Sequence, residues 1–462
     1  MSERSAITRH ALTVLAGQLA VMAFGVTDTI VAGRHAEASL AALSIGSAIF
    51  ISVYVALMGL LQALLPVWAE QRGAQNPADI GRTFRQALYL CAATCLLGMA
   101  ALLFPDAVLE WTDVPTALRA PVSQYLGVLA LALPPALLFR LYSTLNQALG
   151  HPQLVTWLQV AALFVKIPLS IWFTFGGAGL PAMGVVGCAW ATLVVNCTLL
   201  GLGLYLLRTQ DIYTPLRLWR SMERPDWTQL GAFARLGVPA ALAITVEVTS
   251  YTLMALFIAR QGTLATAGHQ IAANLAAVLY MVPLSFAIAT SARVSFWRGA
   301  GNDALARHAV WMGFWLSALT SIALSAILFI AKESLARVYS NDADVILLTS
   351  ALLVWVAVYH LFDAVQTLCV FVLRCYRITL APLVVYGCML WGMGLGGGYV
   401  LAYQGMGSLP ALQSPAPFWA ASAAALAVTA AAFAWMLQRA LNASLHPAPA
   451  LHGAACLQGK QH

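Results

Sequence analysis

Long apolar runs, separated by short polar segments, set the pattern of this chain. A helix of about 20 apolar residues crosses the hydrocarbon core of a bilayer. The pattern therefore predicts twelve membrane-spanning helices, at His10–Ala32, Leu40–Trp68, Phe84–Phe104, Val122–Gln147, Leu154–Phe175, Gly184–Leu207, Phe233–Ile258, Leu264–Phe296, His308–Ala331, Val345–Leu373, Leu380–Ala402 and Phe418–Gln438. The last two are the least distinct, because glycine and alanine dilute their hydrophobicity.

Composition agrees with an all-α integral membrane protein. Of the 462 residues, 61% are hydrophobic and 9% are charged, and the mean hydropathy is +0.80. Soluble domains carry about 25% charged residues. The N-terminus enters its first apolar run without a small-residue cleavage site, so we expect no secretory signal. The eight cysteines include no CxxC pair, which favours small core residues over disulfides or a metal site.

The distribution of basic residues predicts the orientation in the membrane. With the N-terminus in the cytoplasm, the inside segments hold sixteen Lys or Arg and the outside segments hold five. This positive-inside bias predicts a multi-pass membrane protein with both termini in the cytoplasm. We expect the membrane to be the bacterial inner membrane. The net charge of +7 is thereby explained by topology, and we expect no nucleic-acid partner.

The chain repeats itself at an offset of 226 residues. Arg72–Asn76 (RGAQN) follows the second run, and Arg298–Asn302 (RGAGN) follows the eighth. Six spans separate the copies, so the halves have the same orientation and are related by an axis along the membrane normal. We expect an N-terminal lobe over residues 1–210, a cytoplasmic linker over 211–230, a C-terminal lobe over 231–440 and a disordered cytoplasmic tail over 441–462.

Three acidic residues lie within apolar runs: Asp28, Glu247 and Asp363. A carboxylate in hydrocarbon costs a few kcal/mol or more unless it is paired, protonated or bound to an ion. Such acids are typical of ion or substrate pathways, and the alternative is a structural hydrogen bond between helices. The repeat places Met254, Val21 and Leu137 opposite them, so each half has its own polar site.

Several motifs together resemble the multidrug and toxic compound extrusion (MATE) family. They are GVTDTIVAG (Gly25–Gly33), VVGCAWAT (Val185–Thr192), AGHQIAAN (Ala267–Asn274) and YHLFDAVQ (Tyr359–Gln366), and the similarity runs from about residue 8 to 440. The presence of both Glu247 and Asp363 is similar to the NorM branch. The resemblance implies two six-helix lobes that form a V around a central cavity. It also implies multidrug efflux, in which organic cations leave in exchange for Na⁺ or H⁺.

The resemblance implies a role for each polar residue. Asp28 would be the acid of the N-terminal lobe, and Glu247, Asp363 and Tyr359 would form a cation site, with Na⁺ as a possible metal, in the C-terminal lobe. Two carboxylates in a low dielectric repel, and a shared proton or a bound Na⁺ would relieve that repulsion. A lipophilic organic cation would compete for the same charge. We also include Gln270 and Gln366 among the site residues, and expect Gln366 to face the cavity.

One segment departs from the family pattern. NorM-like proteins usually carry two asparagines in the fifth helix, where this chain has FVKIPLS, with Lys166 and Ser170 in those places. Lysine offers a positive charge and no acceptor. We predict an ion pair between Lys166 and Asp28; the alternative is that Lys166 snorkels outward or faces another helix.

Other functions were weighed against the same residues. A flippase for a lipid-linked or anionic substrate would want a cationic cavity, whereas the candidates here are mainly acidic. A major-facilitator transporter would usually carry a GxxxDRxGRR-like loop where this chain has EQRGAQNPADIGR, and a membrane enzyme would need a catalytic motif. We therefore expect a monomeric antiporter for cationic amphipathic drugs, with no cofactor besides a coupling ion. Family resemblance favours Na⁺ slightly over H⁺.

Overall fold

The computed structural model of the protein describes residues 2–111, 115–177, 179–405 and 410–445. Within those ranges the chain is helical, apart from connecting segments and one isolated bridge between Gly177 and Leu180. Twelve helical segments are long and apolar enough to cross a membrane, and they match the twelve predicted spans. The predicted all-α integral membrane fold is confirmed.

The N-terminal lobe contains the first six spans. Its helices are α1 (Glu3–His35), α2 (Glu37–Gln62), α3 (Leu65–Gly73), α4 (Pro77–Leu103), α5 (Asp106–Trp111), α6 (Thr116–Leu149), α7 (Pro152–Phe175) and α8 (Val185–Thr209). Helices α2 and α3 together form one span, Glu37–Gly73. A 3₁₀ helix, η1 (Asp211–Leu216), begins the connection to the second lobe.

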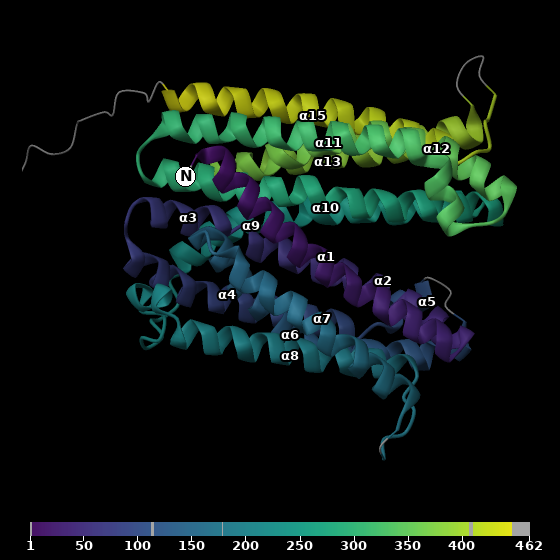
Figure 1. Ribbon diagram of the computed structural model, residues 1–462, viewed down its shortest axis with the longest axis horizontal. Coiled ribbons are helices and arrows are strands. Elements are labelled where there is room, and N and C mark those ends of the chain that lie inside the picture. The colour runs from purple at the N-terminus through teal and green to yellow at the C-terminus, as the bar shows by residue number, and fades with distance from the viewer. Residues whose placement is uncertain (1, 112–114, 178, 406–409, 446–462) are drawn as a thin grey trace, which may run out of the picture.

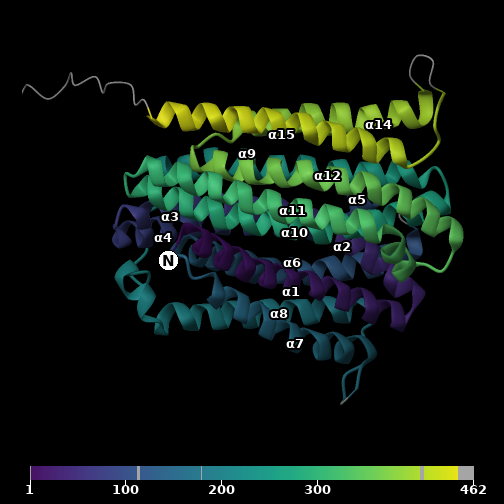
Figure 2. The same cartoon turned by 45° about the horizontal axis from the view of Figure 1, so that its top comes forward.

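The C-terminal lobe contains the other six spans. Its elements are α9 (Trp227–Ala259), α10 (Thr263–Gly299), α11 (Asp303–Tyr339), α12 (Ala343–Cys375), α13 (Leu380–Tyr386), the π-helical η2 (Gly387–Gly396), α14 (Gly397–Tyr399), the π-helical η3 (Val400–Gln404) and α15 (Ala416–Leu445). The eleventh span is thus a helix interrupted by π turns along its glycine-rich sequence. In Figures 1 and 2 the two lobes occupy separate halves of the molecule.

Polar caps extend several helices beyond their apolar runs. The hydroxyl of Ser2 accepts a hydrogen bond from the Ser5 N–H, so α1 begins at Glu3 and not at the predicted His10. Hydropathy marks only the part of a helix that lies in hydrocarbon, which explains the difference. The last helix continues to Leu445, so residues 441–445 of the predicted disordered tail are helical. The rest of that tail, 446–462, lies outside the described residues.

The internal repeat is visible in the helix boundaries. Helices α2 and α10 begin at Glu37 and Thr263, which are 226 residues apart, and α6 and α12 end at Leu149 and Cys375. Equivalent asparagines cap the next helices: Asn76 Oδ1 accepts from Asp79 N–H, and Asn302 Oδ1 accepts from Leu305 N–H. The lobes are therefore parallel structural repeats, as the sequence predicted.

The two lobes meet at the end of the molecule where α1 begins, named here the N-terminal end. A Cβ atom at Gly73 would lie 1.9 Å from the Phe296 carbonyl oxygen, and one at Gly299 would lie 1.8 Å from the Glu70 carbonyl oxygen. Only glycine allows the two backbones to approach so closely. Figure 1 shows α1 diverging from α10 towards the opposite end. The lobes thus form the predicted V.

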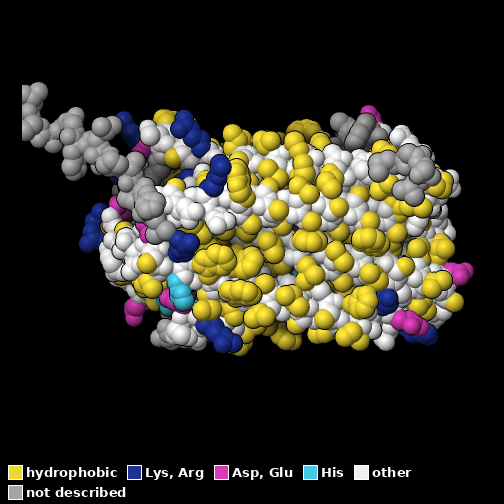
Figure 3. Space-filling view, turned by 90° about the horizontal axis from the view of Figure 1, so that it is seen from above, with side chains coloured by type: hydrophobic (Ala, Val, Ile, Leu, Met, Phe, Trp, Pro, Cys, Tyr) yellow, Lys and Arg dark blue, Asp and Glu magenta, His cyan; other side chains and the backbone are white. Residues whose placement is uncertain are grey.

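The surface divides into an apolar band and charged ends. Figure 3 shows hydrophobic side chains along the length of the spans, with Lys and Arg gathered mainly at the N-terminal end. The end of α15 lies at the same end as the start of α1 in Figure 1. This distribution is that of a multi-pass membrane protein.

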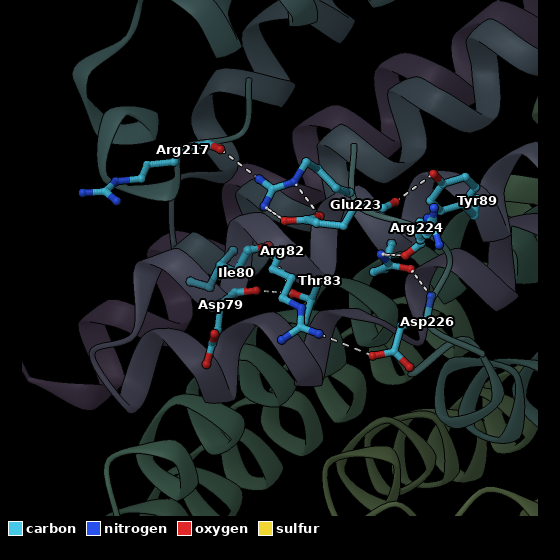
Figure 4. Close-up of polar contacts among 11 residues, drawn as sticks. Asp79, Ile80, Arg82, Thr83, Tyr89, Arg217, Glu223, Arg224 and Asp226 are labelled. Carbon is cyan, nitrogen blue, oxygen red and sulfur yellow. Dashed lines mark hydrogen bonds and ion pairs between the residues drawn. The ribbon is translucent and has the colours of Figure 1, made fainter. Parts of the chain in front are cut away.

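The connection between the lobes is attached to α4. Arg85 of α4 donates from Nε to Glu223 Oε2 at 2.9 Å and from Nη1 to the Arg217 carbonyl oxygen at 2.9 Å. The Tyr89 hydroxyl donates to the Glu223 carbonyl oxygen at 2.9 Å, and Arg82 lies 3.5 Å from Asp226 (Figure 4). The connection between the lobes is therefore fixed to the N-terminal lobe through α4.

Candidate cation sites in the two lobes

The acid of the N-terminal lobe is paired with a lysine. Asp28 lies on α1, and Lys166 and Ser170 lie one turn apart on α7. The distance from Lys166 Nζ to Asp28 Oδ1 is 2.8 Å, and the Ser170 hydroxyl donates to the same oxygen at 2.9 Å. The predicted ion pair between Lys166 and Asp28 is present.

The ammonium of Lys166 has no donor left for another partner. Besides Asp28, it donates to the Cys188 carbonyl oxygen at 3.1 Å and to the Thr192 hydroxyl at 2.7 Å, both on α8. A lysine has three N–H donors, and its side chain here is 1% exposed. The lysine thus supplies the positive charge beside the Asp28 carboxylate, and all three of its donors are used.

The C-terminal lobe holds its two acids differently. Asp363, on α12, is 3% exposed and accepts a hydrogen bond from Gln366 Nε2 at 2.8 Å. The Tyr386 hydroxyl donates to Gln366 Oε1 from the eleventh span. Gln366 is 1% exposed, so the expectation that it faces the central cavity is wrong. It lies inside the lobe, where it orients the carboxylate of Asp363.

Glu247, on α9, lines a small cavity inside the same lobe. The cavity has a volume of about 10 Å³, and Tyr251, Tyr359 and Trp419 contribute aromatic walls. Their rings meet edge to face, with centroids 5.8–6.1 Å apart. That volume is close to the space that one water molecule needs.

Neither acid of this lobe has a cationic partner at ion-pair distance among the described residues. Asp363 is near enough to Glu247 for the two charges to interact. The Nε and Nη1 atoms of Arg374, at the end of α12, have no hydrogen-bond partner in the described structure. Arg374 is 4% exposed and lies in the last turn of α12.

The structure thus separates the predicted site residues into two groups. Asp28, Lys166 and Ser170 form one group in the N-terminal lobe, and Glu247, Asp363, Tyr359 and Gln366 lie in the core of the other. Gln270 is exposed on α10 and does not line the cavity beside Glu247. Within the described ranges, no three His, Cys, Asp or Glu side chains cluster as metal ligands.

Sequence reasoning missed two members of the second group. Tyr386, in the eleventh span, was not among the predicted site residues, although its hydroxyl contacts Gln366. Ser250, one turn from Glu247, also lines the small cavity. A polar residue one turn from an intramembrane acid is the signal that would have indicated Ser250.

Comparison with known proteins identifies the family. The MatE family model matches residues 14–172 and 239–400, once in each lobe. The probable multidrug resistance protein NorM of Aromatoleum aromaticum is 36% identical over 93% of this chain and 92% of its own length. The protein of the same name from Chromobacterium violaceum is 32% identical, over 96% of each chain.

Solved structures show the same fold. The eukaryotic MATE transporter AtDTX14 superposes with a TM-score of 0.84 at 19% identity, over 96% of this chain and 98% of that one. The Vibrio cholerae MATE transporter VcmN, in its bent form, also gives a TM-score of 0.84, at 16% identity and with the same coverage. The chain belongs to the MATE family of membrane transporters.

Proposed function

We propose that the protein is a multidrug efflux antiporter that exports cationic amphipathic drugs in exchange for inward Na⁺ or H⁺. The names of the relatives, probable multidrug resistance proteins, support efflux of drugs. The proposed coupling site is the C-terminal lobe pair, Glu247 and Asp363, with Tyr359. Asp28 and Lys166 would stabilise the N-terminal lobe.

The contrast between the two lobes carries this assignment. Asp28 has a lysine 2.8 Å away, whereas Glu247 and Asp363 have no cation at ion-pair distance among the described residues. Two nearby carboxylates in a low dielectric repel, and a proton or a small cation relieves the repulsion. The cavity beside Glu247 has room for a small ion or one water.

The aromatic walls favour an organic cation as the competing ligand. Tyr251, Tyr359 and Trp419 surround the cavity that contains the Glu247 carboxylate. Aromatic faces attract cations, most strongly where water is excluded. Competition between the drug and the coupling ion for one negative charge is sufficient for antiport, because binding of one releases the other.

The arrangement of the lobes supports alternating access. The lobes are packed together at the N-terminal end and part towards the other. With the N-terminal end placed in the cytoplasm of a bacterial inner membrane, as the charge bias predicts, this is the outward-open state of a monomer. Rocking of one lobe against the other would close the outer side and open the N-terminal end to the cytoplasm.

Transport by the purified protein tests the proposal. Proteoliposomes containing only this protein would be given a Na⁺ gradient or a pH gradient while ethidium movement is followed. We expect movement with one gradient, and its loss in Glu247→Gln and in Asp363→Asn. Glu37→Gln, at an exposed acid at the start of α2, is the matched control and should transport normally. Movement with neither gradient would refute drug antiport for this dye.

A further inference from the structure

A cavity of about 250 Å³ lies at the N-terminal end, between the two lobes. Its walls come from the first turns of α1, the end of α3, the turn between α6 and α7, and α10. Five basic side chains line it: Arg9, His10, Arg72, His151 and Arg293. No Asp or Glu is among the described residues that line it; the other polar side chains of its wall, Thr13 and Gln153, are neutral.

Among the described residues, only one of its three arginines, Arg293, pairs with a carboxylate. Arg293 donates from Nε to Glu3 Oε2 at 3.0 Å. Arg72 contacts the Ala148 carbonyl oxygen at 3.4 Å and the face of the Phe296 ring at 5.2 Å. Neither Arg72 nor Arg9 forms an ion pair within the described part of the chain.

His10 supplies an independent indication of a ligand. The residue is 7% exposed, it lines the cavity, and its Nε2 atom has no hydrogen-bond partner among the described residues. Buried polar atoms are almost always hydrogen-bonded, so one that lacks a partner requires an explanation. A ligand acceptor in the cavity would provide the missing bond.

The internal repeat shows which partner is absent. At the offset of 226, Arg72 corresponds to Arg298 and His151 to Arg377. Arg298 and Arg377 both pair with Glu70, with Arg298 Nη1 3.5 Å from Glu70 Oε1. The residue that corresponds to Glu70 is Phe296. One half of the lobe contact therefore has two basic residues and an acid, and the other half has two basic residues and a phenyl ring.

The backbone holds Arg72 at the cavity. Gly150 ends α6 with φ of +77°, a conformation that favours glycine, and a Cβ atom there would lie 2.6 Å from Arg72 Nη1. The close approach positions the guanidinium beside His151. A side chain at position 150 would therefore displace the guanidinium of Arg72 from this place.

We propose that this cavity binds a phosphate group, which takes the place of the missing carboxylate. Guanidinium groups bind phosphate through paired, charge-assisted hydrogen bonds, and imidazole N–H groups add further donors. The phosphate belongs either to the headgroup of an anionic lipid or to a free phosphate ion. Because Arg72, His10 and His151 belong to one lobe and Arg293 to the other, a bound phosphate holds the lobes together at this end.

Binding to the full-length protein tests the proposal and distinguishes the two sources. Inorganic phosphate would be titrated into purified protein by calorimetry at constant ionic strength. In a second arm, protein from vesicles of phosphatidylcholine with phosphatidylglycerol would be examined by native mass spectrometry for retained lipid. Loss of one charge-assisted hydrogen bond should weaken binding about tenfold or more in Arg72→Gln and in His151→Gln. Arg208→Gln, at an exposed arginine near the end of α8, should not change it.

Each outcome has a definite meaning. Saturable binding of inorganic phosphate that weakens in the two cavity variants supports a free phosphate site. Retention of phosphatidylglycerol that falls in the same variants, but not in Arg208→Gln, supports the lipid headgroup. If neither ligand binds wild-type protein more tightly than it binds folded Arg72→Gln and His151→Gln, the proposal is refuted. Thermal unfolding of each variant establishes that it is folded.

Discussion

Lys166 Nζ lies 2.8 Å from Asp28 Oδ1, in the interior of the N-terminal lobe, and neither charge has another charged partner at ion-pair distance among the described residues. Removal of one member of a buried pair leaves the other charge uncompensated. We expect Lys166→Met to destabilise the protein by about 3–5 kcal/mol, and Asp28→Asn to act similarly. Thermal and denaturant unfolding in detergent would measure the change.

The double variant, Asp28→Asn with Lys166→Met, checks that the loss comes from the pair. It should lose much less stability than the sum of the single variants, because no charge is left unpaired. If the loss of stability in the double variant equals the sum of the losses in the two single variants, the two charges do not stabilise each other.

Gln366 links Asp363 to Tyr386, so its amide is expected to position the acid. Gln366→Met keeps the volume of the side chain and leaves two buried polar groups unsatisfied, at about 1–3 kcal/mol each. We expect folded but less stable protein that needs a higher concentration of the coupling ion for half-maximal efflux. Efflux measured against ion concentration would show this change. Tyr386→Phe, which removes only the hydroxyl, should have a smaller effect in the same direction; an unchanged ion dependence in both would contradict the positioning role.

Glu70 joins the lobes, because it pairs with both Arg298 and Arg377. Glu70→Gln should favour separation of the lobes at the N-terminal end. Each lost ion pair should cost the closed arrangement about 1 kcal/mol or less, so the population of separated lobes should rise a few-fold. Spin labels on cysteines placed at Gln75 and Asn302, in a background without the native cysteines, would report the distance between the lobes.

A matched control for this experiment exists in α11. Glu333 pairs with Arg337 within one helix and does not join the lobes. Glu333→Gln should leave the distance distribution unchanged. Equal distributions in wild-type protein and Glu70→Gln would show that the glutamate does not hold the lobes together.

Glu223 gives the stability of the protein a defined dependence on pH. Its hydrogen bonds with Arg85 lower the pKa of the Glu223 carboxyl. A lowered pKa in the folded state contributes stability above the usual glutamate value of about 4.3, and that contribution is lost as the pH falls through the lowered value. Glu223→Gln should therefore reduce the melting temperature at neutral pH, and the difference from wild type should vanish in acid. A difference that is constant across this range would exclude the ionised pair as its source.

The sequence predicted the architecture well, because each span must be apolar over the width of the membrane. It also predicted the pair of Asp28 and Lys166, since a lysine within an apolar helix needs a partner and both residues fall at a similar depth. The pattern along one helix does not distinguish a residue that faces the lobe core from one that faces the central cavity. Gln366 was placed wrongly for that reason.

Contacts between distant segments were not predictable from single motifs. The basic cavity combines four segments, from Ala6 to Arg293, and nothing in any one segment shows that its basic residues meet those of the others. Arg374 shows the same difficulty, because the charge at the end of an apolar run gives no sign of its burial. The repeat aligns Glu70 with Phe296 in the sequence, but only the structure shows that Glu70 pairs with two arginines and that its counterpart is therefore a missing acid.

The attachment of the interlobe connection to α4 determines how far the lobes can travel. Seventeen residues separate Thr209 from Trp227. If this segment were unattached and fully extended, at about 3.5 Å per residue, the lobes could move apart by roughly 60 Å. Because Arg217, Glu223 and Asp226 are bound to the first lobe, the free tether shrinks to the peptide at the start of α9. The chain thus acts as a short pivot, which permits rotation of one lobe against the other and prevents their separation.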